Sequence, residues 1–292
     1  MRNQLTGAAL ACAAALLAHG AYAQQDFSAV EVKVHPVAGN VYYLEGAGGN
    51  VGVSVGADGV IMIDDQFAPL TEKLVAAIRT LSQEPIRFVI NTHIHGDHTG
   101  GNENLGKMGI PIVAHDNVAV RLAKGVNGAP PAPVEARPVV TYADSVTFHL
   151  NGDTVRVVKV PAAHTDGDSV IHFVDANVIH AGDVFRTTGY PGVDAGNGGT
   201  VKGTLETMQI LIDMAGPDTR IIPGHGTVSD RAALIEFRDM IAEVQRRITD
   251  LIRQGMTLEQ VVAAKPTEDL DARWGSFERF LPGFYNALKE EI

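Results

Sequence analysis

Short apolar runs separated by polar turns cover the first part of the chain, and this pattern predicts strands. Residues 30–65 contain "NVYYLEG", "VGVSV" and "VIMIDD", with a turn at Asp58-Gly59 before the last run. Short runs bounded by such turns are typical of an antiparallel meander. A glycine-rich tip, "GAGGN" (46–50), joins the first two runs. We expect this tip to be a mobile flap, because glycine-rich tips carry few fixed contacts.

Helical spacing follows the strand pattern twice along the chain. "PLTEKLVAAIRTLSQ" is amphipathic with a helical period, and a buried strand follows at residues 86–90. A second strand and helix follow at "IPIVAH" and "DNVAVRLAKG". The proline-rich segment at residues 127–138 is typical of an extended surface linker.

Beyond that linker the strand pattern starts again. "SVTFHL", "DTVRVVKV", "DSVIHFV" and "NVIHAGDV" predict strands, and "GTLETMQILIDMA" predicts a helix. After the strand "TRIIPGHG", a long helix is predicted from Asp230 to Gly255, and two short helices complete the chain. Strands followed by helices on both sides of the linker indicate two α/β halves packed sheet to sheet.

The first 23 residues have the pattern of a secretory signal peptide. Arg2 precedes an Ala/Leu-rich run, and Ala21, Tyr22 and Ala23 form a small-residue cleavage site. The alternative is an uncleaved membrane anchor, but the apolar run is short for a bilayer span. We therefore expect residues 24–292 to form the mature domain, periplasmic or secreted, with no membrane contact after cleavage.

Composition narrows the class of partner. The 292-residue chain has a net charge of −11, and nothing in it offers a basic stripe for phosphates, so nucleic acid is not an expected partner. The only cysteine, Cys12, lies in the predicted signal peptide, so no thiolate is expected in catalysis or metal binding. A small-molecule substrate is the expected partner, and the sequence carries no signal for a particular oligomeric state.

Metal-competent side chains are concentrated in "NTHIHGDHTGGN", directly after the strand at residues 86–90. Imidazole and carboxylate groups are the ligands that zinc accepts in the absence of thiolates. His93 and His95 can point to one side of an extended chain, while Asp97 and His98 turn the other way. Two adjacent metal sites built from one loop are therefore expected.

Three further candidates occupy similar positions in the second half of the chain. His164 and His225 each follow an apolar strand in a loop of small residues, and the carboxylate of Asp183 lies in the same kind of place. These side chains converge on the first motif only if their strands are neighbours that end at one edge.

Together, "THIHGDH", "AAHTDGD", "AGDVF" and "PGHG" resemble the metallo-β-lactamase-fold hydrolase superfamily in content and order. The resemblance implies an α/β fold, a four-layer αβ/βα sandwich of two sheets flanked by helices, with two zinc ions per chain at the seam. It implies one zinc held by His93, His95 and His164, a second held by Asp97, His98 and His225, and Asp183 bridging both.

Such a centre suits hydrolysis of an acyl bond. Zinc lowers the pKa of bound water to about 7, so a metal-bound hydroxide would be the nucleophile at neutral pH. Asp97 is expected to orient that nucleophile and to pass its proton to the leaving group.

The resemblance leaves several substrates open. We expect β-lactam opening first, with lactone or thioester hydrolysis by a member of the same superfamily as the alternative. A metal-stabilised binding protein without turnover is the third reading. Asp183 favours the thioesterases and lactonases, because the cysteine-free lactamases generally lack a bridging carboxylate. The export signal favours a lactamase.

Two cations are candidates for substrate binding. Arg186, three residues after Asp183, could offer a paired donor to a substrate carboxylate, and Lys202 competes with it from later in the same loop. A solvated arginine or a surface ion pair is the alternative for Arg186. Five other histidines are expected to be structural: His35, His149, His172, His115 and His180. Of these, His115 and His180 could contact the metal ligands.

Overall fold

The structure, a computed structural model, describes residues 26–126 and 128–292. The predicted signal peptide, residues 1–23, therefore lies outside the described residues. The fold is built from residues Val32–Ile292, which form one unit. In the described part of the chain, no helix is both long and apolar enough to cross a bilayer.

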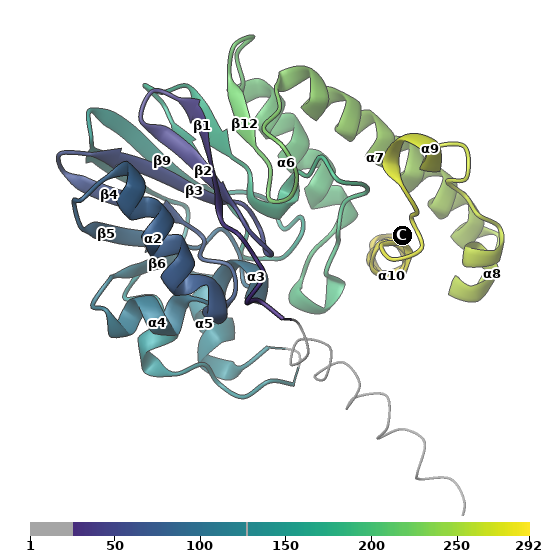
Figure 1. The fold of residues 1–292 in the computed structure, drawn as a ribbon. Coiled ribbons are helices and arrows are strands. Elements are labelled where there is room, and N and C mark those ends of the chain that lie inside the picture. The colour runs from purple at the N-terminus through teal and green to yellow at the C-terminus, as the bar shows by residue number, and fades with distance from the viewer. Residues whose placement is uncertain (1–25, 127) are drawn as a thin grey trace, which may run out of the picture. The chain divides into compact units, whose positions relative to one another are not determined.

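The first of two sheets contains seven strands, ordered in space as along the chain (Figure 1). They are β1 (Lys33–Ala38), β2 (Val41–Glu45), β3 (Val51–Gly56), β4 (Gly59–Ile63), β5 (Ile86–Ile90), β6 (Ile112–His115) and β7 (Val140–Tyr142). Strands β1 to β4 pair antiparallel, as the meander pattern predicts, and β4 to β7 pair parallel.

The second sheet contains five strands in the order β12-β11-β10-β9-β8. They are β8 (Ser145–Leu150), β9 (Asp153–Lys159), β10 (Ser169–Phe173), β11 (Val178–His180) and β12 (Arg220–Ile222). Strand β10 is antiparallel to both β9 and β11, and β11 is parallel to β12. Strands β9, β11 and β12 therefore run in one direction, and their carboxyl ends lie at the same edge of the sheet.

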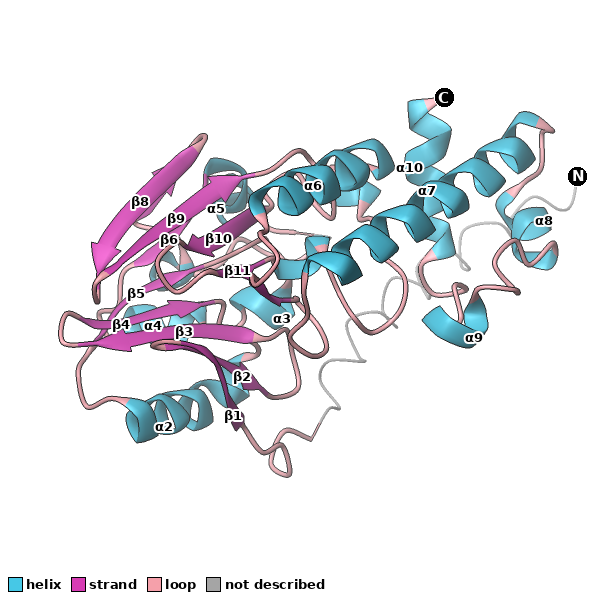
Figure 2. Ribbon diagram, turned by 90° about the horizontal axis from the view of Figure 1, so that it is seen from above, coloured by secondary structure: helices cyan, strands magenta, loops and turns pink. Residues whose placement is uncertain are grey.

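Helices cover the outer face of each sheet, which gives the predicted four layers (Figure 2). The α-helices are α2 (Thr71–Leu81), α3 (Gly96–Thr99), α4 (Asn102–Lys107), α5 (Asp116–Lys124), α6 (Val201–Met214), α7 (Arg231–Arg253), α8 (Leu258–Ala263), α9 (Asp271–Trp274) and α10 (Leu281–Glu291). The 3₁₀ helices are η2 (Ala68–Leu70), η3 (Val134–Ala136), η4 (Gly182–Val184) and η5 (Ala195–Asn197). Three helices follow Gly255 in the described chain, so the expectation of two is wrong.

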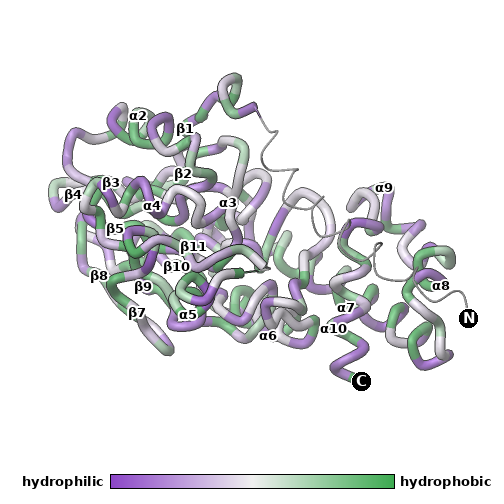
Figure 3. Tube along the Cα trace, turned by 90° about the horizontal axis from the view of Figure 1, so that it is seen from below, coloured by the Kyte–Doolittle hydropathy of each residue, from purple (hydrophilic) through white to green (hydrophobic). Residues whose placement is uncertain are grey.

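Two apolar cores hold the layers together. Ile63 and Ile90 of the first sheet pack with Phe173 and Ile222 of the second sheet. On the far side of the second sheet, α6, α7 and α10 form another core around Phe237. Hydrophobic and hydrophilic residues alternate along α7, as expected of a helix with one buried face (Figure 3). Burial of these faces fixes the two sheets face to face.

The prediction that residues 127–138 separate the two halves is wrong, because the first sheet continues beyond that segment. Strand β7 follows it and pairs parallel with β6. Tyr142 of β7 is buried and contributes to the core between the sheets. The β7 strand is three residues long and its first two residues are exposed, so the sequence offers no alternation that could reveal it. The chain passes from one sheet to the other between β7 and β8.

Candidate metal centre

The candidate ligands lie on loops at the carboxyl ends of four strands. They are His93, His95, Asp97 and His98 after β5, His164 after β9, Asp183 after β11 and His225 after β12. Because β9, β11 and β12 end at one edge, the three loops of the second sheet meet the loop after β5. A backbone hydrogen bond joins the two sheets here, from the Ser169 amide to the Thr92 carbonyl at 2.9 Å.

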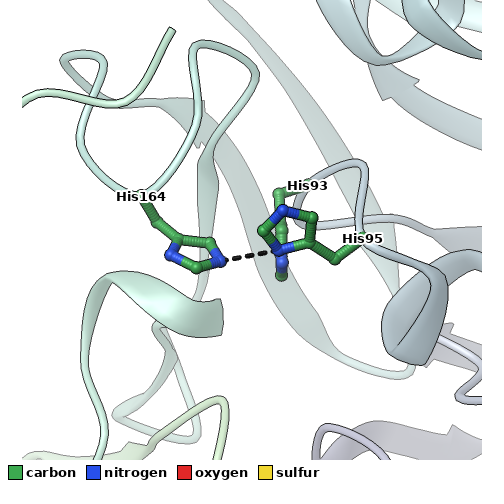
Figure 4. A group of neighbouring side chains, drawn as sticks. All are labelled: His93, His95 and His164. Carbon is green, nitrogen blue, oxygen red and sulfur yellow. Dashed lines mark hydrogen bonds between the residues drawn. The ribbon is translucent and has the colours of Figure 1, made fainter. Parts of the chain in front are cut away.

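The first group of potential metal ligands consists of His93, His95 and His164. Figure 4 shows the three imidazole rings pointing toward one another from two loops. Nε2 of His164 lies 2.8 Å from Nδ1 of His95. One nitrogen from each ring lies within 4.8 Å of the others, so the three could hold one ion.

The second group consists of Asp97 and His98, in the short helix α3, and His225, in the loop after β12. The His98 ring also lies close to the first group, with its centroid 4.1 Å from that of His93. Oδ2 of Asp97 lies 3.3 Å from Nε2 of His225 and 3.6 Å from Nε2 of His98. The structure therefore brings together the residues that the resemblance assigns to a second ion.

Asp183 lies between the two groups. Its Oδ1 is 3.2 Å from Nε2 of His98, and its Oδ2 is 3.2 Å from Nε2 of His225. The same Oδ2 is 3.6 Å from Nε2 of His164. One carboxylate thus contacts members of both groups, which is the position that a bridging ligand requires.

Hydrogen bonds on the outer side of each ring determine which nitrogen can bind a metal. Nε2 of His95 lies 2.8 Å from a carboxylate oxygen of Asp194, and Nδ1 of His164 lies 2.8 Å from the carbonyl oxygen of Gly192. Both oxygens can only accept, so both ring nitrogens must donate. Nδ1 of His95 and Nε2 of His164 then face each other on the inner side of the two rings. A metal ion that binds both nitrogens would take the place of a proton shared between them.

Asp64 orients the other two buried rings. Its carboxylate accepts a hydrogen bond from Nδ1 of His98 at 2.7 Å and from the Thr92 hydroxyl at 2.7 Å. The Thr92 oxygen in turn lies 3.0 Å from Nδ1 of His93. Each ring therefore directs Nε2 inward. Asp64 and Thr92 are absent from the sequence prediction, although "VIMIDD" places Asp64 at the end of a predicted strand.

Three buried atoms at the centre test whether the residues fit a metal. Nε2 of His93, Nε2 of His98 and Oδ1 of Asp183 form no hydrogen bond among the described residues, although the last two atoms lie 3.2 Å apart. Buried polar atoms are normally paired, because an unpaired one costs about 1–3 kcal/mol. All three belong to potential ligands and lie in one place. A divalent cation would satisfy them, so the residues present fit a metal centre.

Burial and charge shift the pKa values of the ligands in two directions. Burial holds the pKa of His93 well below its usual range and lowers that of His164 to about 4, so both rings are neutral and can bind a metal. Burial also lowers the pKa of His98, but the carboxylates of Asp183 and Asp97 outweigh it and raise the value well above the usual range. Metal binding at His98 must therefore displace a proton.

A polar network behind His95 is a second feature that sequence reasoning missed. The Asp194 carboxylate also accepts a hydrogen bond from the side-chain amide of Asn197 at 2.7 Å. The Asn197 oxygen accepts from the Arg121 guanidinium at 3.0 Å, and Arg121 forms a bidentate pair with Asp166. Asp194 lies in a glycine-rich loop with no periodic pattern, so the sequence offers no signal for it.

The hairpin tip at residues 46–50 lies beside the centre, but the expectation that it carries few fixed contacts is wrong. The Gly49 amide donates to the Asp97 carbonyl at 3.1 Å, and its carbonyl accepts from the Gln66 side chain at 2.7 Å. Asn50 donates to the carbonyls of Pro223 and Gly226 in the loop that carries His225. A Cβ on Gly49 would overlap the His98 ring. Glycine is needed here for close approach, and the tip forms a packed wall of the site.

The two predicted substrate-binding cations have different positions. Lys202 lies in the first turn of α6 rather than in the preceding loop; its side chain is 76% exposed and its ammonium is 3.8 Å from Glu206. This is the arrangement of a solvated cation, and it does not support an anchoring role. Arg186 is half-buried, and its backbone forms an isolated bridge with that of His225.

Three of the histidines expected to be structural form hydrogen bonds with other residues of the protein. His115 caps α5 through the Asn117 amide, and His35 pairs with Glu45. His180 is buried: its Nε2 lies 3.0 Å from the Asn50 carbonyl, and its Nδ1 accepts from the Gly182 amide. His180 thereby holds the backbone next to Asp183.

These elements define a two-sheet α/β fold with a carboxylate–histidine cluster at its seam. The family model of the metallo-beta-lactamase superfamily matches residues 36–225 of the chain. The chain therefore belongs to the metallo-beta-lactamase superfamily. Membership supports a metal-dependent hydrolase.

Curated relatives of the chain are named for several activities. The chain is 25% identical over 251 residues to an atrochrysone carboxyl ACP thioesterase of Aspergillus fumigatus, covering 80% of this chain and 54% of that protein. It is 27% identical to a hydroxyacylglutathione hydrolase of Polaromonas sp., covering 54% of this chain and 55% of that protein. It is 22% identical to a metallo-beta-lactamase type 2 of Bacillus cereus, covering 63% of this chain and 69% of that protein.

The chain thus spans about half the length of the first two relatives. Among solved structures, a metallo-beta-lactamase from Pontibacter korlensis superposes with a TM-score of 0.62 at 20% identity, covering 73% of this chain and 99% of that chain. This likeness supports the fold.

Substitution Gly49→Ala should disrupt the second group of ligands. The new methyl group overlaps the His98 ring, so the ring or the hairpin must move, and overpacking of this kind costs on the order of 1–3 kcal/mol. We expect a lower Tm and less zinc bound per chain, measured by thermal unfolding and elemental analysis. Gly216→Ala, where the new atom meets only ordinary van der Waals contact, is the control. Unchanged zinc content in Gly49→Ala would contradict the close approach.

Substitution Asp194→Ala should weaken metal binding at the first group. Without the carboxylate, His95 loses the acceptor that fixes its tautomer and ring orientation, and such changes typically cost about 10–100-fold in metal affinity. Competition with a chromogenic chelator measures this affinity. Asp218→Ala, in an exposed turn, should retain wild-type affinity. Equal affinities in both variants would show that Asp194 has no positioning role.

Proposed function

We propose that the protein is a dizinc hydrolase that cleaves an acyl bond of a small-molecule substrate. The position of Asp183 carries this proposal, because its carboxylate contacts ligands of both groups. A single four-coordinate ion would leave several of the seven clustered side chains unused. Two ions that share Asp183 would use all of them.

The residues have separate tasks in this proposal. His93, His95 and His164 would hold one ion, Asp97, His98 and His225 the other, and Asp183 both. When bound, the metals would polarise the acyl oxygen and supply a nucleophile from water at neutral pH. Asp64 and Asp194 keep the imidazoles in the required tautomers from outside.

Asp97 is the group placed to move a proton. Its side chain is 27% exposed, whereas that of Asp183 is 7% exposed, so Asp97 faces the open side of the centre. Burial raises the pKa of Asp97, but His98 and His225 outweigh it and hold the pKa below its usual range. The carboxylate is therefore ionised at neutral pH and can accept a proton from the attacking water. Passing that proton to the leaving group completes hydrolysis to a carboxylic acid.

Two classes of substrate are supported by different observations. Thioester or ester hydrolysis is favoured by the shared position of Asp183 and by relatives that include a thioesterase. Opening of a β-lactam, the first expectation from the sequence, is favoured by a relative that is a metallo-beta-lactamase. Export to the periplasm or beyond is proposed from the pattern of residues 1–23, and it also favours the lactam.

Zinc-loaded full-length protein should contain about two zinc ions per chain and lose its hydrolase activity with chelator. A panel of a chromogenic cephalosporin, an aryl ester, a lactone and an acyl thioester, assayed with and without chelator, identifies the class. Elemental analysis measures the metal. One zinc ion per chain after reconstitution would overturn the dinuclear proposal. If no substrate shows chelator-sensitive turnover, the hydrolase proposal is wrong and a metal-stabilised binding protein is the remaining function.

A pair of histidine variants separates ligands from structural residues. His95→Ala should abolish turnover and reduce zinc content, because its ring contributes to the first group. His149→Ala removes an exposed ring on the edge strand β8 and should leave zinc content unchanged. Similar loss of zinc in both variants would invalidate the assignment.

A further inference from the structure

Two arginines from distant parts of the chain meet over one aromatic ring. Cζ of Arg186 lies 5.2 Å from the centroid of the Phe280 ring, and Cζ of Arg279 lies 5.7 Å from the same centroid. Arg186 follows η4, whereas Arg279 and Phe280 directly precede α10. Guanidinium groups at this distance from a ring face are typical of cation–π contacts.

Packing holds the C-terminal segment against the loop that carries Arg186. The Tyr190 hydroxyl donates to the carboxylate of Asp271 in α9 at 2.9 Å. A Cβ on Gly189 would lie 3.1 Å from the carbonyl oxygen of Trp274, so the two backbones approach closely. Packing of the backbone segments that carry them therefore brings Arg186 and Phe280 together.

The backbone of Arg186 lies beside the candidate metal centre. Its backbone pairs with that of His225, and the Thr187 amide donates to the His225 carbonyl at 3.0 Å. Burial lowers the pKa of Arg186, the carboxylates of Asp183 and Asp97 raise it, and Arg279 lowers it. The groups that act on Arg186 are thus two ligands of the centre and a second cation.

Neither arginine has an acidic partner in the described chain. Within those residues no carboxylate lies within 4.0 Å of either guanidinium. Nε of Arg186 is buried without a hydrogen-bond partner in the described chain. A different nitrogen of the same guanidinium, Nη2, donates to the Thr188 hydroxyl at 3.4 Å. By contrast, Arg273 also lies over a ring, that of Trp274, but is paired with Glu236. An anion beside Arg186 and Arg279 would satisfy a buried donor and offset their repulsion.

We propose that Arg186, Arg279 and Phe280 form a subsite that binds a carboxylate of the substrate while its acyl bond lies at the metal centre. Planar guanidinium groups bind carboxylates through paired hydrogen bonds, and the Phe280 ring provides an apolar surface for the carbons that link carboxylate and acyl group. The substrate is then an anionic acyl compound rather than a neutral lactone. This inference rests on the proposed hydrolase function.

Two aryl esters of similar length test the subsite in zinc-loaded full-length protein. 4-Nitrophenyl hydrogen adipate carries a carboxylate, and 4-nitrophenyl hexanoate does not. We expect Arg279→Gln and Arg186→Gln each to lower the ratio of kcat/KM for the adipate ester over the hexanoate ester by at least about tenfold. Arg279 is exposed, so its variant is expected to fold normally. Arg273→Gln is the matched control, because it removes a ring-stacked arginine outside the subsite.

Calorimetric titration of succinate into the same zinc-loaded proteins gives a readout that does not depend on turnover. Any contact of succinate with zinc is common to all variants. A higher Kd for succinate in Arg279→Gln and Arg186→Gln, but not in Arg273→Gln, would therefore show that Arg186 and Arg279 bind the carboxylate. An unchanged ester ratio and an unchanged Kd in both variants would overturn the subsite, even if both esters are hydrolysed. Selective loss of succinate binding in a protein that hydrolyses neither ester would support the subsite and count against the hydrolase function.

Discussion

The concentration of imidazole and carboxylate groups in the largely buried seam between two sheets is the constraint on which the rest of the structure depends. His98 and Asp183 are buried with ligand atoms that have no hydrogen-bond partner in the described chain. Such groups are stable only when the outer side of each is satisfied by protein and the inner side by a cation. Asp64 supplies the outer partner for His98, and Asp194 does the same for His95.

The same constraint explains why backbone approaches the centre so closely. With Gly49 against the His98 ring, the first sheet's hairpin seals one side of the site, and Asn50 ties that hairpin to the loop after β12. Larger side chains at the tip would separate the sheets where the ligand groups must meet. The exposed side is left to Asp97, His95 and His225, whose side chains are 23–27% exposed. We therefore expect substrate to approach the centre from the side of these three residues.

In the proposed subsite, the C-terminal segment extends the candidate site beyond the metal centre. The segment before α10 packs against the loop after η4 and brings Phe280 beneath Arg186. In the proposed function, the metal centre at the seam could hydrolyse many acyl compounds, and this C-terminal segment selects those that carry a negative charge. The division is physically reasonable, because the core that holds α10 against α6 and α7 is separate from the core that aligns the sheets.

The sequence by itself predicted the layered fold, through the resemblance of its motifs to the superfamily. It also predicted all seven candidate ligands, because each follows an apolar strand and four of them lie in one short motif. Local patterns of this kind report strands, helices and the residues at their ends. Only the tertiary structure decided that β7 completes the first sheet, that the hairpin tip is packed, and that Lys202 faces solvent while Arg186 meets Arg279. It also revealed Asp64 and Asp194 behind the ligands. These features depend on contacts between residues far apart in the chain. A periodic pattern of apolar residues carries no information about which distant side chain will donate or accept a given hydrogen bond.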